Sequence, residues 1–123
     1  MFFRLDFQST VPIYRQIRDQ VVLAVADGRL TPGEHLPTTR ALAEDAGINV
    51  MTVSKAYQLL KAEGYLTADR RSGAVVCTPP GQKVLTAEQL ARLQLLAGEA
   101  RLAGLSKKEF LAQCAAVYGE TEG

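Results

Sequence analysis

The chain has 123 residues, of which 47% are hydrophobic and 22% charged, with 14 basic and 13 acidic side chains. This length suits one domain, or a small domain with an appendage, and the apolar content can form a core. The near balance of charge excludes a histone-like polycation and an acidic disordered tail. There is no apolar run of about 20 residues, as a membrane span needs, and no secretory signal. We therefore expect a cytoplasmic protein without a membrane partner.

Motifs for catalysis or metal binding are absent from the sequence. Its one histidine, His35, lies between Pro32 and Pro37, and its two cysteines, Cys77 and Cys114, lack metal-type spacing. The sequence has no glycine motif for nucleotides, no zinc-protease motif and no serine-nucleophile motif. We predict that the chain is not an enzyme and has no catalytic residue, no metal site and no cofactor.

The first periodic segment predicts a helix that follows a short extended arm. Pro12 suits its first turn, with Thr10 or Val11 as the cap, and Gly28 is placed to end it. Residues 30–37 contain two prolines and a glycine, which predicts a loop. The apolar positions of this helix recur at three- and four-residue spacing: Ile13, Ile17, Val21 and Ala24.

Two further helices are predicted in close succession. Thr38 is a good cap for a short helix that ends at Gly47, and Asn49 is a good cap for the next helix, residues 50–62. Ile48 is placed to pack on Val53 as a hydrophobic staple. The short helix turns three apolar residues inward: Leu42, Ala43 and Ala46.

The helix predicted over residues 50–62 has an apolar stripe and an opposite, mostly polar face. The stripe consists of Val53, Ala56, Tyr57 and Leu60. The opposite face is centred on Met51, Lys55 and Gln58, with Thr52 and Ser54 on its flanks.

A β-hairpin is predicted next, with strands over residues 65–68 and 74–78. The turn between them contains Arg70, Arg71 and Gly73. Two helices joined by a tight Gly-Ile-Asn turn and followed by a basic-tipped hairpin are the layout of a winged helix-turn-helix.

Pro79 and Pro80 begin the only convincing boundary, which predicts a head over residues 10–79 and a tail over residues 80–123. In the tail, two capping-box sequences, Thr86 with Gln89 and Ser106 with Glu109, predict helices over about 87–103 and 107–118. The apolar residues of the tail are too many for one stripe, so it should pack on another subunit. The expected dimerisation residues are Leu90, Leu93, Ala97, Ala100, Phe110 and Leu111.

The head resembles the GntR family of bacterial transcriptional regulators. The resemblance lies in PIYRQI and in GRLTPGEHLPTTRALAEDAGINVMTVSKAYQLLKAEGYL, whose fixed points span three helices. The tail, with EARLAGLSKKEFL, is similar to that of the YtrA subfamily, in which two helices replace a larger effector-binding domain. The related MocR branch carries an aminotransferase-like domain, for which 123 residues leave no room.

The resemblance implies a role for individual residues. Arg40 would contact DNA from the start of the second helix, while Thr52 would face a phosphate. Lys55 would reach a phosphate or a base edge, and Gly73 would sit at a wing tip in the minor groove. The full set of expected DNA-binding residues is Thr38, Thr39, Arg40, Asn49, Met51, Thr52, Ser54, Lys55, Gln58, Arg70, Arg71 and Gly73.

Three of these expectations have independent physical support. A helix start capped by Thr38 offers backbone N–H groups to a phosphate, and Arg40 can form paired hydrogen bonds to guanine or a phosphate. A glycine at position 73 lets a hairpin tip approach the groove closely. Two interpretations of Met51 stay open: it contacts a thymine methyl group, or it is simply an exposed residue.

The sequence also departs from the family pattern. Val50 and Ser54 occupy positions where many members carry arginine, so base readers are fewer, and Arg71 replaces a usual wing glycine. Residues 38–73 hold five basic and four acidic side chains, so their arginines and lysines could be solvated surface alone. Because Arg40, Lys55 and Arg70–Arg71 can lie on one side of the head, we favour the DNA-binding interpretation. The small net charge predicts weak affinity for non-specific DNA.

The fold class predicted is mainly α with a small β-hairpin: a winged helix-turn-helix head and a two-helix C-terminal dimerisation tail. The function predicted is a homodimeric, sequence-specific transcriptional regulator, a repressor rather than an activator. Its expected partners are a double-stranded DNA operator with inverted half-sites, a second copy of the chain and a small-molecule effector of unknown chemistry. The alternative is a winged-helix protein–protein interaction module without direct DNA readout.

Overall fold

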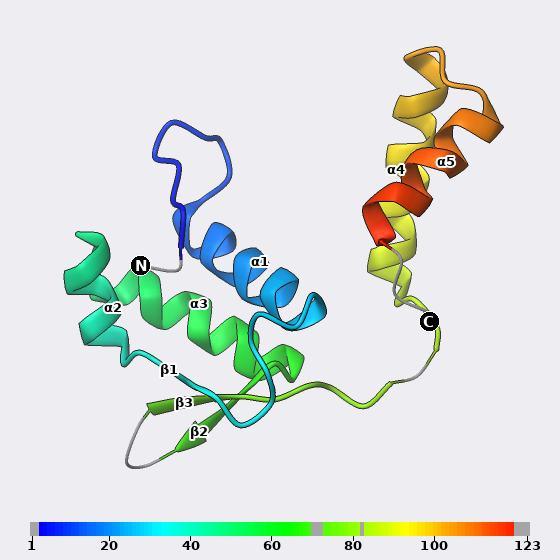
Figure 1. Ribbon diagram of the computed structural model, residues 1–123. Helices are drawn as coiled ribbons and strands as arrows, with labels where there is room; N and C mark the ends of the chain where they lie inside the picture. The colour runs from blue at the N-terminus through cyan, green and yellow to red at the C-terminus, as the bar shows by residue number, and fades with distance from the viewer. Residues whose placement is uncertain (1–2, 70–72, 82, 120–123) are drawn as a thin grey trace. The chain divides into compact units, whose positions relative to one another are not determined.

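The computed structural model describes residues 3–69, 73–81 and 83–119 (Figure 1). The chain divides into two compact units, the head (Met1–Gly81) and the tail (Gln82–Gly123). The elements of the head are α1 (Ile13–Ala26), β1 (His35–Leu36), α2 (Thr39–Ala46), α3 (Val50–Glu63), β2 (Leu66–Asp69) and β3 (Gly73–Val76). Those of the tail are α4 (Ala87–Leu102) and α5 (Lys107–Tyr118).

The predicted fold class is confirmed, but the sheet is larger than the predicted hairpin. Its three antiparallel strands have the order β1-β3-β2. β1 lies inside the segment predicted to be a loop and pairs His35 with Val75 and Leu36 with Ala74. His35 and Leu36 are too few to show a hydrophobic period, so the sequence could not predict this strand. They form a strand because they pair with the edge of β3.

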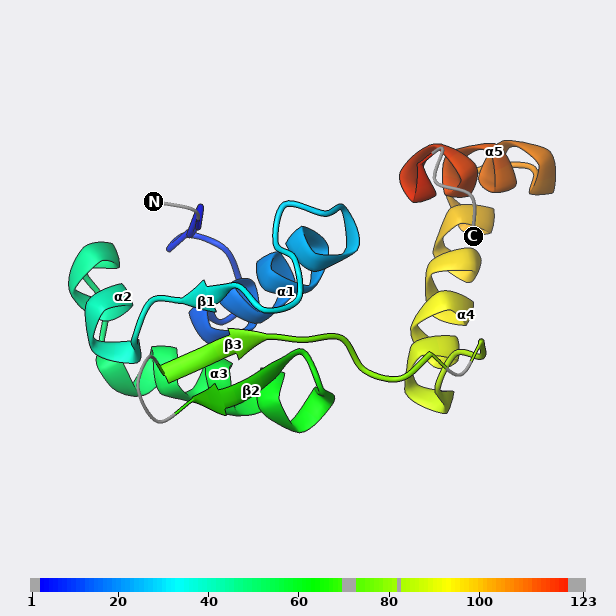
Figure 2. The same cartoon turned by 60° about the horizontal axis from the view of Figure 1, so that its bottom comes forward.

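The three head helices lie on one face of this sheet (Figure 2). Between the helices and the strands is one apolar core, whose largest fully buried side chains are Ile17, Val21, Leu42, Val53, Leu60 and Val76. The predicted stripes of α1 and α3 supply most of them, and Leu36 of β1 adds a further buried side chain. A core closed by its own chain leaves the outer face of α3 available for another molecule.

Caps set the ends of the head helices. The Oγ1 atom of Thr38 accepts a hydrogen bond from the Ala41 amide at 3.1 Å, and the Oδ1 atom of Asn49 accepts one from the Met51 amide at 2.7 Å. Both predicted caps are therefore confirmed. Gly47 ends α2 in the left-handed conformation, with φ of 69°, which glycine adopts at little cost.

The start of α1 differs from the prediction. Its N-cap is Pro12, and no side chain caps it, whereas Thr10 or Val11 was expected. The Ser9 hydroxyl accepts a hydrogen bond from the Val11 amide instead, so the chain turns before the helix begins. The Pro12 carbonyl then accepts hydrogen bonds from the amides of the first helical turn.

The predicted N-terminal arm lies along α1 and is held there by two glutamines one helical turn apart. Gln20 exchanges two hydrogen bonds with the backbone of Arg4, at 2.9 and 2.8 Å. Gln16 does the same with Asp6, at 2.8 and 2.9 Å. Because the amide side chains supply the partners that a neighbouring strand would supply, the arm docks and Phe3 is buried.

The tail consists of two capped helices without a core. Both predicted capping boxes are present, Thr86 with Gln89 and Ser106 with Glu109. The backbone amide of Ser106 holds the pKa of Glu109 below its ordinary value by donating a hydrogen bond to it. Over residues 83–119, however, no side chain is buried. In the described part of the chain, no helix is long and apolar enough to cross a membrane.

Candidate nucleic-acid interface

The two faces of α3 differ as the sequence predicted. Val53, Ala56, Tyr57 and Leu60 are buried in the core. On the opposite face Lys55 and Gln58 are exposed, and Met51 retains 71% of its accessible surface. Thr52 and Ser54 are half-buried between the two faces. A single helix therefore presents one thioether and several hydrogen-bonding groups outward from a fixed position.

The N-terminus of α2 contributes three further candidate contacts, Thr38, Thr39 and Arg40. The Thr38 hydroxyl caps the helix, Thr39 is half-buried, and Arg40 is exposed in the first turn. The first turn of a helix leaves amide groups outside the helical hydrogen-bond ladder, where an anion can bind them. Asn49 resembles Thr38, because its side-chain oxygen already caps α3.

A hollow of about 300 Å³ separates the start of α2 from the base of the hairpin. Its lining includes Thr38, Thr39, Tyr57, Lys61 and Gly73. The Tyr57 hydroxyl donates a hydrogen bond to the Pro37 carbonyl at 2.8 Å. Burial raises the pKa of Tyr57, so this hydroxyl stays protonated and neutral.

Lys61 is a candidate contact that sequence reasoning did not single out. It is exposed in the last turn of α3 and lies outside the face centred on Lys55. Only the folding of the hairpin beside α2 brings Lys61 into one hollow with Thr38 and Gly73. No local pattern in the sequence could have indicated this.

Gly73 has a positive φ of 86° and is exposed at the start of β3. A Cβ atom added there would meet the Thr38 Cγ2 atom at 3.8 Å, which is ordinary van der Waals contact. Within the chain, therefore, only the backbone angle requires glycine. Arg70 and Arg71, also expected to touch DNA, lie outside the described residues.

Lys55 does not extend freely from α3. Its Nζ atom lies 4.1 Å from the ring centroid of Tyr14 on α1, within the range of a cation–π interaction. Tyr14 is half-buried and packs against the head core. The sequence analysis placed Lys55 on the outer face but did not connect it with Tyr14.

An ion-pair network fixes α1 to the end of α3. Arg18 bonds the two carboxylate oxygens of Glu63 at 2.8 and 3.2 Å and the Asp19 carboxylate at 2.9 Å. Burial opposes the charge on Arg18, but these hydrogen bonds outweigh it and raise the pKa of Arg18. The negative charge of Glu63 is thus neutralised within the head.

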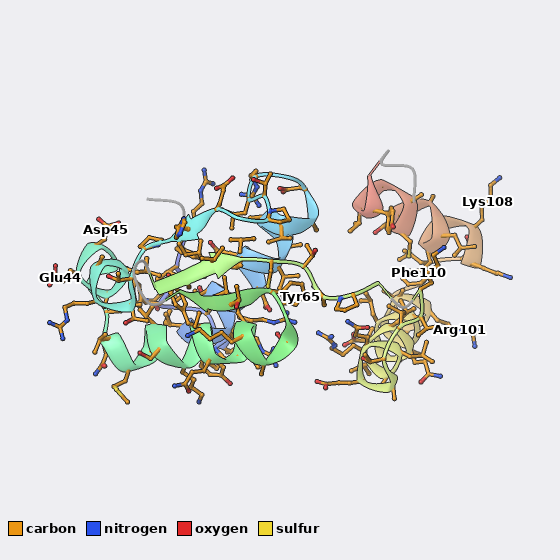
Figure 3. All side chains as sticks on the ribbon, turned by 90° about the horizontal axis from the view of Figure 1, so that it is seen from below. Glu44, Asp45, Tyr65, Arg101, Lys108 and Phe110 are labelled. Atoms are coloured by element: carbon orange, nitrogen blue, oxygen red, sulfur yellow. The ribbon has the colours of Figure 1, made fainter. Side chains whose placement is uncertain are left out.

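The acidic side chains of α2, unlike that of Glu63, point outward. Figure 3 shows Glu44 and Asp45 extending from the C-terminal part of this helix. Among the described residues, no group of three or more His, Cys, Asp or Glu side chains could hold a metal ion.

In the tail, the predicted dimerisation residues differ in their exposure. Leu90, Leu93 and Leu111 are exposed, whereas Ala97, Ala100 and Phe110 are half-buried. Figure 3 shows Phe110 on the side of α5 toward α4, with Lys108 directed outward. Exposed apolar side chains that form a contiguous patch are typical of interaction surfaces.

The family model for bacterial regulatory proteins of the gntR family matches residues 13–76. The chain belongs to the GntR family. It is a DNA-binding transcriptional regulator, as the sequence predicted, and within the family it is YtrA-like. The matched residues include every described residue of the head that was expected to contact DNA.

Relatives support this assignment over most of the chain. The HTH-type transcriptional repressor YtrA of Bacillus subtilis is 34% identical over 96 residues, which are 73% of this chain and 74% of that protein. The HTH-type transcriptional regulator Rv1152 of Mycobacterium tuberculosis is 32% identical over 108 residues, 88% of this chain and 87% of that protein. Several other curated relatives are longer, and the chain spans only 13–18% of them.

Solved structures agree with the sequence comparison. YtrA from Sulfolobus acidocaldarius, a GntR-family transcription factor, superposes with a TM-score of 0.59 and 31% identity. The match covers 98% of this chain and all of that one. The GntR regulator described here therefore shares its winged-helix head and short helical tail with a YtrA protein.

Proposed function

We propose that this GntR regulator represses transcription by binding an inverted-repeat operator as a homodimer. The observation that carries the proposal is the division of α3, whose apolar stripe is buried and whose opposite face presents Met51, Lys55 and Gln58. Repression is favoured because the B. subtilis relative YtrA is named a repressor. Action on chromosomal DNA would place the protein in the cytoplasm.

In the proposed complex, α3 enters the major groove. An α-helix with its side chains is about 10–12 Å wide, and the groove is about 12 Å wide. Gln58 can pair with adenine, Arg40 with guanine, and the methyl group of Met51 can contact thymine. Thr38, Thr39 and Lys61 would hold a phosphate at the hollow between α2 and the hairpin, since amides and ammonium groups both bind anions.

The hairpin would serve as a wing in the minor groove. Gly73 is exposed and has no Cβ atom, so the backbone can approach the sugar walls of a groove about 6 Å wide. Arg70 and Arg71 would contribute positive charge beside it. With an overall charge of +1, each head would bind non-specific DNA weakly, and affinity would depend on joining two heads.

The tail would join the two heads. Its leucines are exposed on capped helices that bury no residue of their own, and a second copy of the same surface can cover them. Two-fold helix-turn-helix proteins read half-sites whose centres are about 34–36 Å apart. We also propose that a small-molecule effector would act through this dimer interface.

The alternative, a protein-docking platform, is less well supported by the same face. A docking surface is expected to present a contiguous apolar patch. Around Met51, however, the outer face of α3 presents Thr52, Ser54, Lys55 and Gln58, which carry hydrogen-bonding groups. This composition suits base edges and phosphates.

The test is selection of duplexes from a randomised pool by the full chain, followed by fluorescence anisotropy on the enriched sequence. We expect two inverted half-sites about one helical turn apart. Enrichment of a single half-site would contradict the homodimeric mode, and no enrichment would contradict sequence-specific binding.

A paired substitution tests the dimer separately. Leu93→Glu with Ala97→Glu should make the protein monomeric in analytical ultracentrifugation, because charges would enter the proposed apolar interface. Leu102→Glu is the matched control, since Leu102 is not among the expected dimerisation residues and is 90% exposed. A dimer that survives the paired change, or one that only the control disrupts, contradicts this interface.

A further inference from the structure

The contact between Lys55 and Tyr14 joins an exposed side chain of α3 to a half-buried ring of α1. Lys55 is exposed on α3, and its side chain is not part of the buried core. Tyr14, by contrast, is half-buried on α1 and packs against the core, which fixes its ring. The Tyr14 ring therefore determines where the Lys55 ammonium group lies, whereas Lys55 does not determine the position of the ring.

The direction of that contact matters for binding. Without it, Lys55 would extend from the middle of the outer face of α3, beside Met51 and Gln58. With its Nζ atom 4.1 Å from the Tyr14 ring centroid, the charge is instead displaced toward α1. When a helix lies in the major groove, its outermost line faces the bases and its sides face the phosphate strands.

We propose that Tyr14 is a positioning residue that holds the Lys55 ammonium at the α1 side of the recognition helix as a preorganised phosphate contact. This inference rests on the proposed groove-binding mode and chooses between the two roles of Lys55, phosphate contact and base reader. A free lysine loses much rotamer entropy when it binds. The aromatic face restricts the side chain beforehand and keeps its charge available, because a cation–π contact leaves N–H groups free.

Lys61 provides the internal comparison. It lies on the same helix and lines the hollow near Gly73, and among the described residues it forms no cation–π contact of the kind that Lys55 forms. No aromatic face therefore positions its charge as Tyr14 positions that of Lys55. Tyr14 should affect the contribution of Lys55 to binding and should not affect that of Lys61.

The experiment is a double-mutant cycle with Tyr14→Leu and Lys55→Gln in the full chain. The probes are the duplex that the wild type enriches and a scrambled duplex of equal length, each titrated over a range of KCl concentrations. Tyr14→Leu should weaken binding to both duplexes by about two- to fivefold and lower the salt dependence. In the Lys55→Gln background it should have no further effect.

Two controls separate positioning from folding. Tyr14→Phe keeps the aromatic face and should retain wild-type affinity. A parallel cycle of Tyr14→Leu with Lys61→Gln should be additive. In the free protein, the ring current of Tyr14 should shift the Lys55 ε-methylene protons upfield, and Tyr14→Leu should abolish that shift.

Three results would overturn the inference. One is an equal loss from Tyr14→Leu with and without Lys55, and another is an absent upfield shift in the free wild type. The third is a Lys55→Gln effect confined to the enriched duplex, which would make Lys55 a base reader. Failure of the proposed function is distinguishable, because the wild type would then enrich no duplex before any variant is made.

Discussion

The head and the tail place their apolar side chains differently. In the head, Leu60 of α3 is fully buried, together with Ile17 of α1 and Leu42 of α2. The predicted inward residues Ile13 and Ala46 are half-buried. In the tail, Leu102 of α4 is 90% exposed and no described residue is buried. Yet the tail helices have the more complete caps, since each begins with a capping box.

This difference teaches that local helix signals and burial are separate requirements. A capping box satisfies amides at the start of a helix whether or not the helix has a partner. Burial needs facing surfaces, which the head finds in its own sheet and helices. Most of the stability of short helices comes from such packing, so the tail surface should be completed by another chain.

The largest expected effect comes from removing the tail. Truncation after Pro80 should leave a head that unfolds cooperatively, because its core lies within Met1–Gly81. Operator affinity should fall by about 10²- to 10⁴-fold, since two half-sites would no longer be linked. Sedimentation checks the mass, and a truncated head that still dimerises at micromolar concentration would contradict this role for the tail.

A matched pair of leucines tests the difference in burial directly. Leu60→Ala should lower the free energy of unfolding by about 2–5 kcal/mol, because it leaves a cavity in the head core. Leu102→Ala should change it by at most about 0.5 kcal/mol. Urea unfolding of the full chain measures both, and a large loss at Leu102 would mean that this face is covered in solution.

Gly73→Asn tests whether the hairpin needs glycine for its fold or for its approach to DNA. Asparagine tolerates a positive φ, and the added Cβ atom has room beside Thr38. The melting temperature should therefore hold, while operator affinity falls at least about tenfold, or about 1.4 kcal/mol, through crowding in the minor groove.

Gly28→Asn is the control for this variant. Gly28 has nearly the same φ, 84°, and nothing lies within 4 Å of its added Cβ atom, so DNA binding should not change. Wild-type operator affinity in a well-folded Gly73→Asn protein would show that the wing stays outside the groove.

The smallest expected effect is that of Lys61→Gln. Loss of one phosphate contact should weaken enriched and scrambled duplexes alike and reduce the salt slope by about one per subunit. Arg101→Gln, an exposed charge on the tail helix α4 (Figure 3), is the control of equal charge and should leave the slope unchanged. If both substitutions change the salt slope equally, the effect of Lys61→Gln comes from net charge and not from a phosphate contact.

Much of the head could be predicted from the sequence because its signals are local. Thr38 and Asn49 cap their helices through amides two or three residues away. The stripe of α3 is readable because buried positions recur every three or four residues. The same period predicted its outer face, including Lys55. The cap of α1 failed as a prediction because hydrogen bonds in the preceding turn compete for Ser9 and Val11.

The sequence by itself determined which segments are helical, where every helix but α1 is capped, and which faces of the head helices are buried, since these depend on neighbours within one turn. Only the tertiary structure decided how distant segments meet: β1 on the edge of β3, the arm on Gln16 and Gln20, and the Lys55 charge on Tyr14. Arg18 and Glu63 likewise meet across 45 residues. Such contacts form when packing brings separate elements within a few ångströms, and no spacing along the chain encodes that distance.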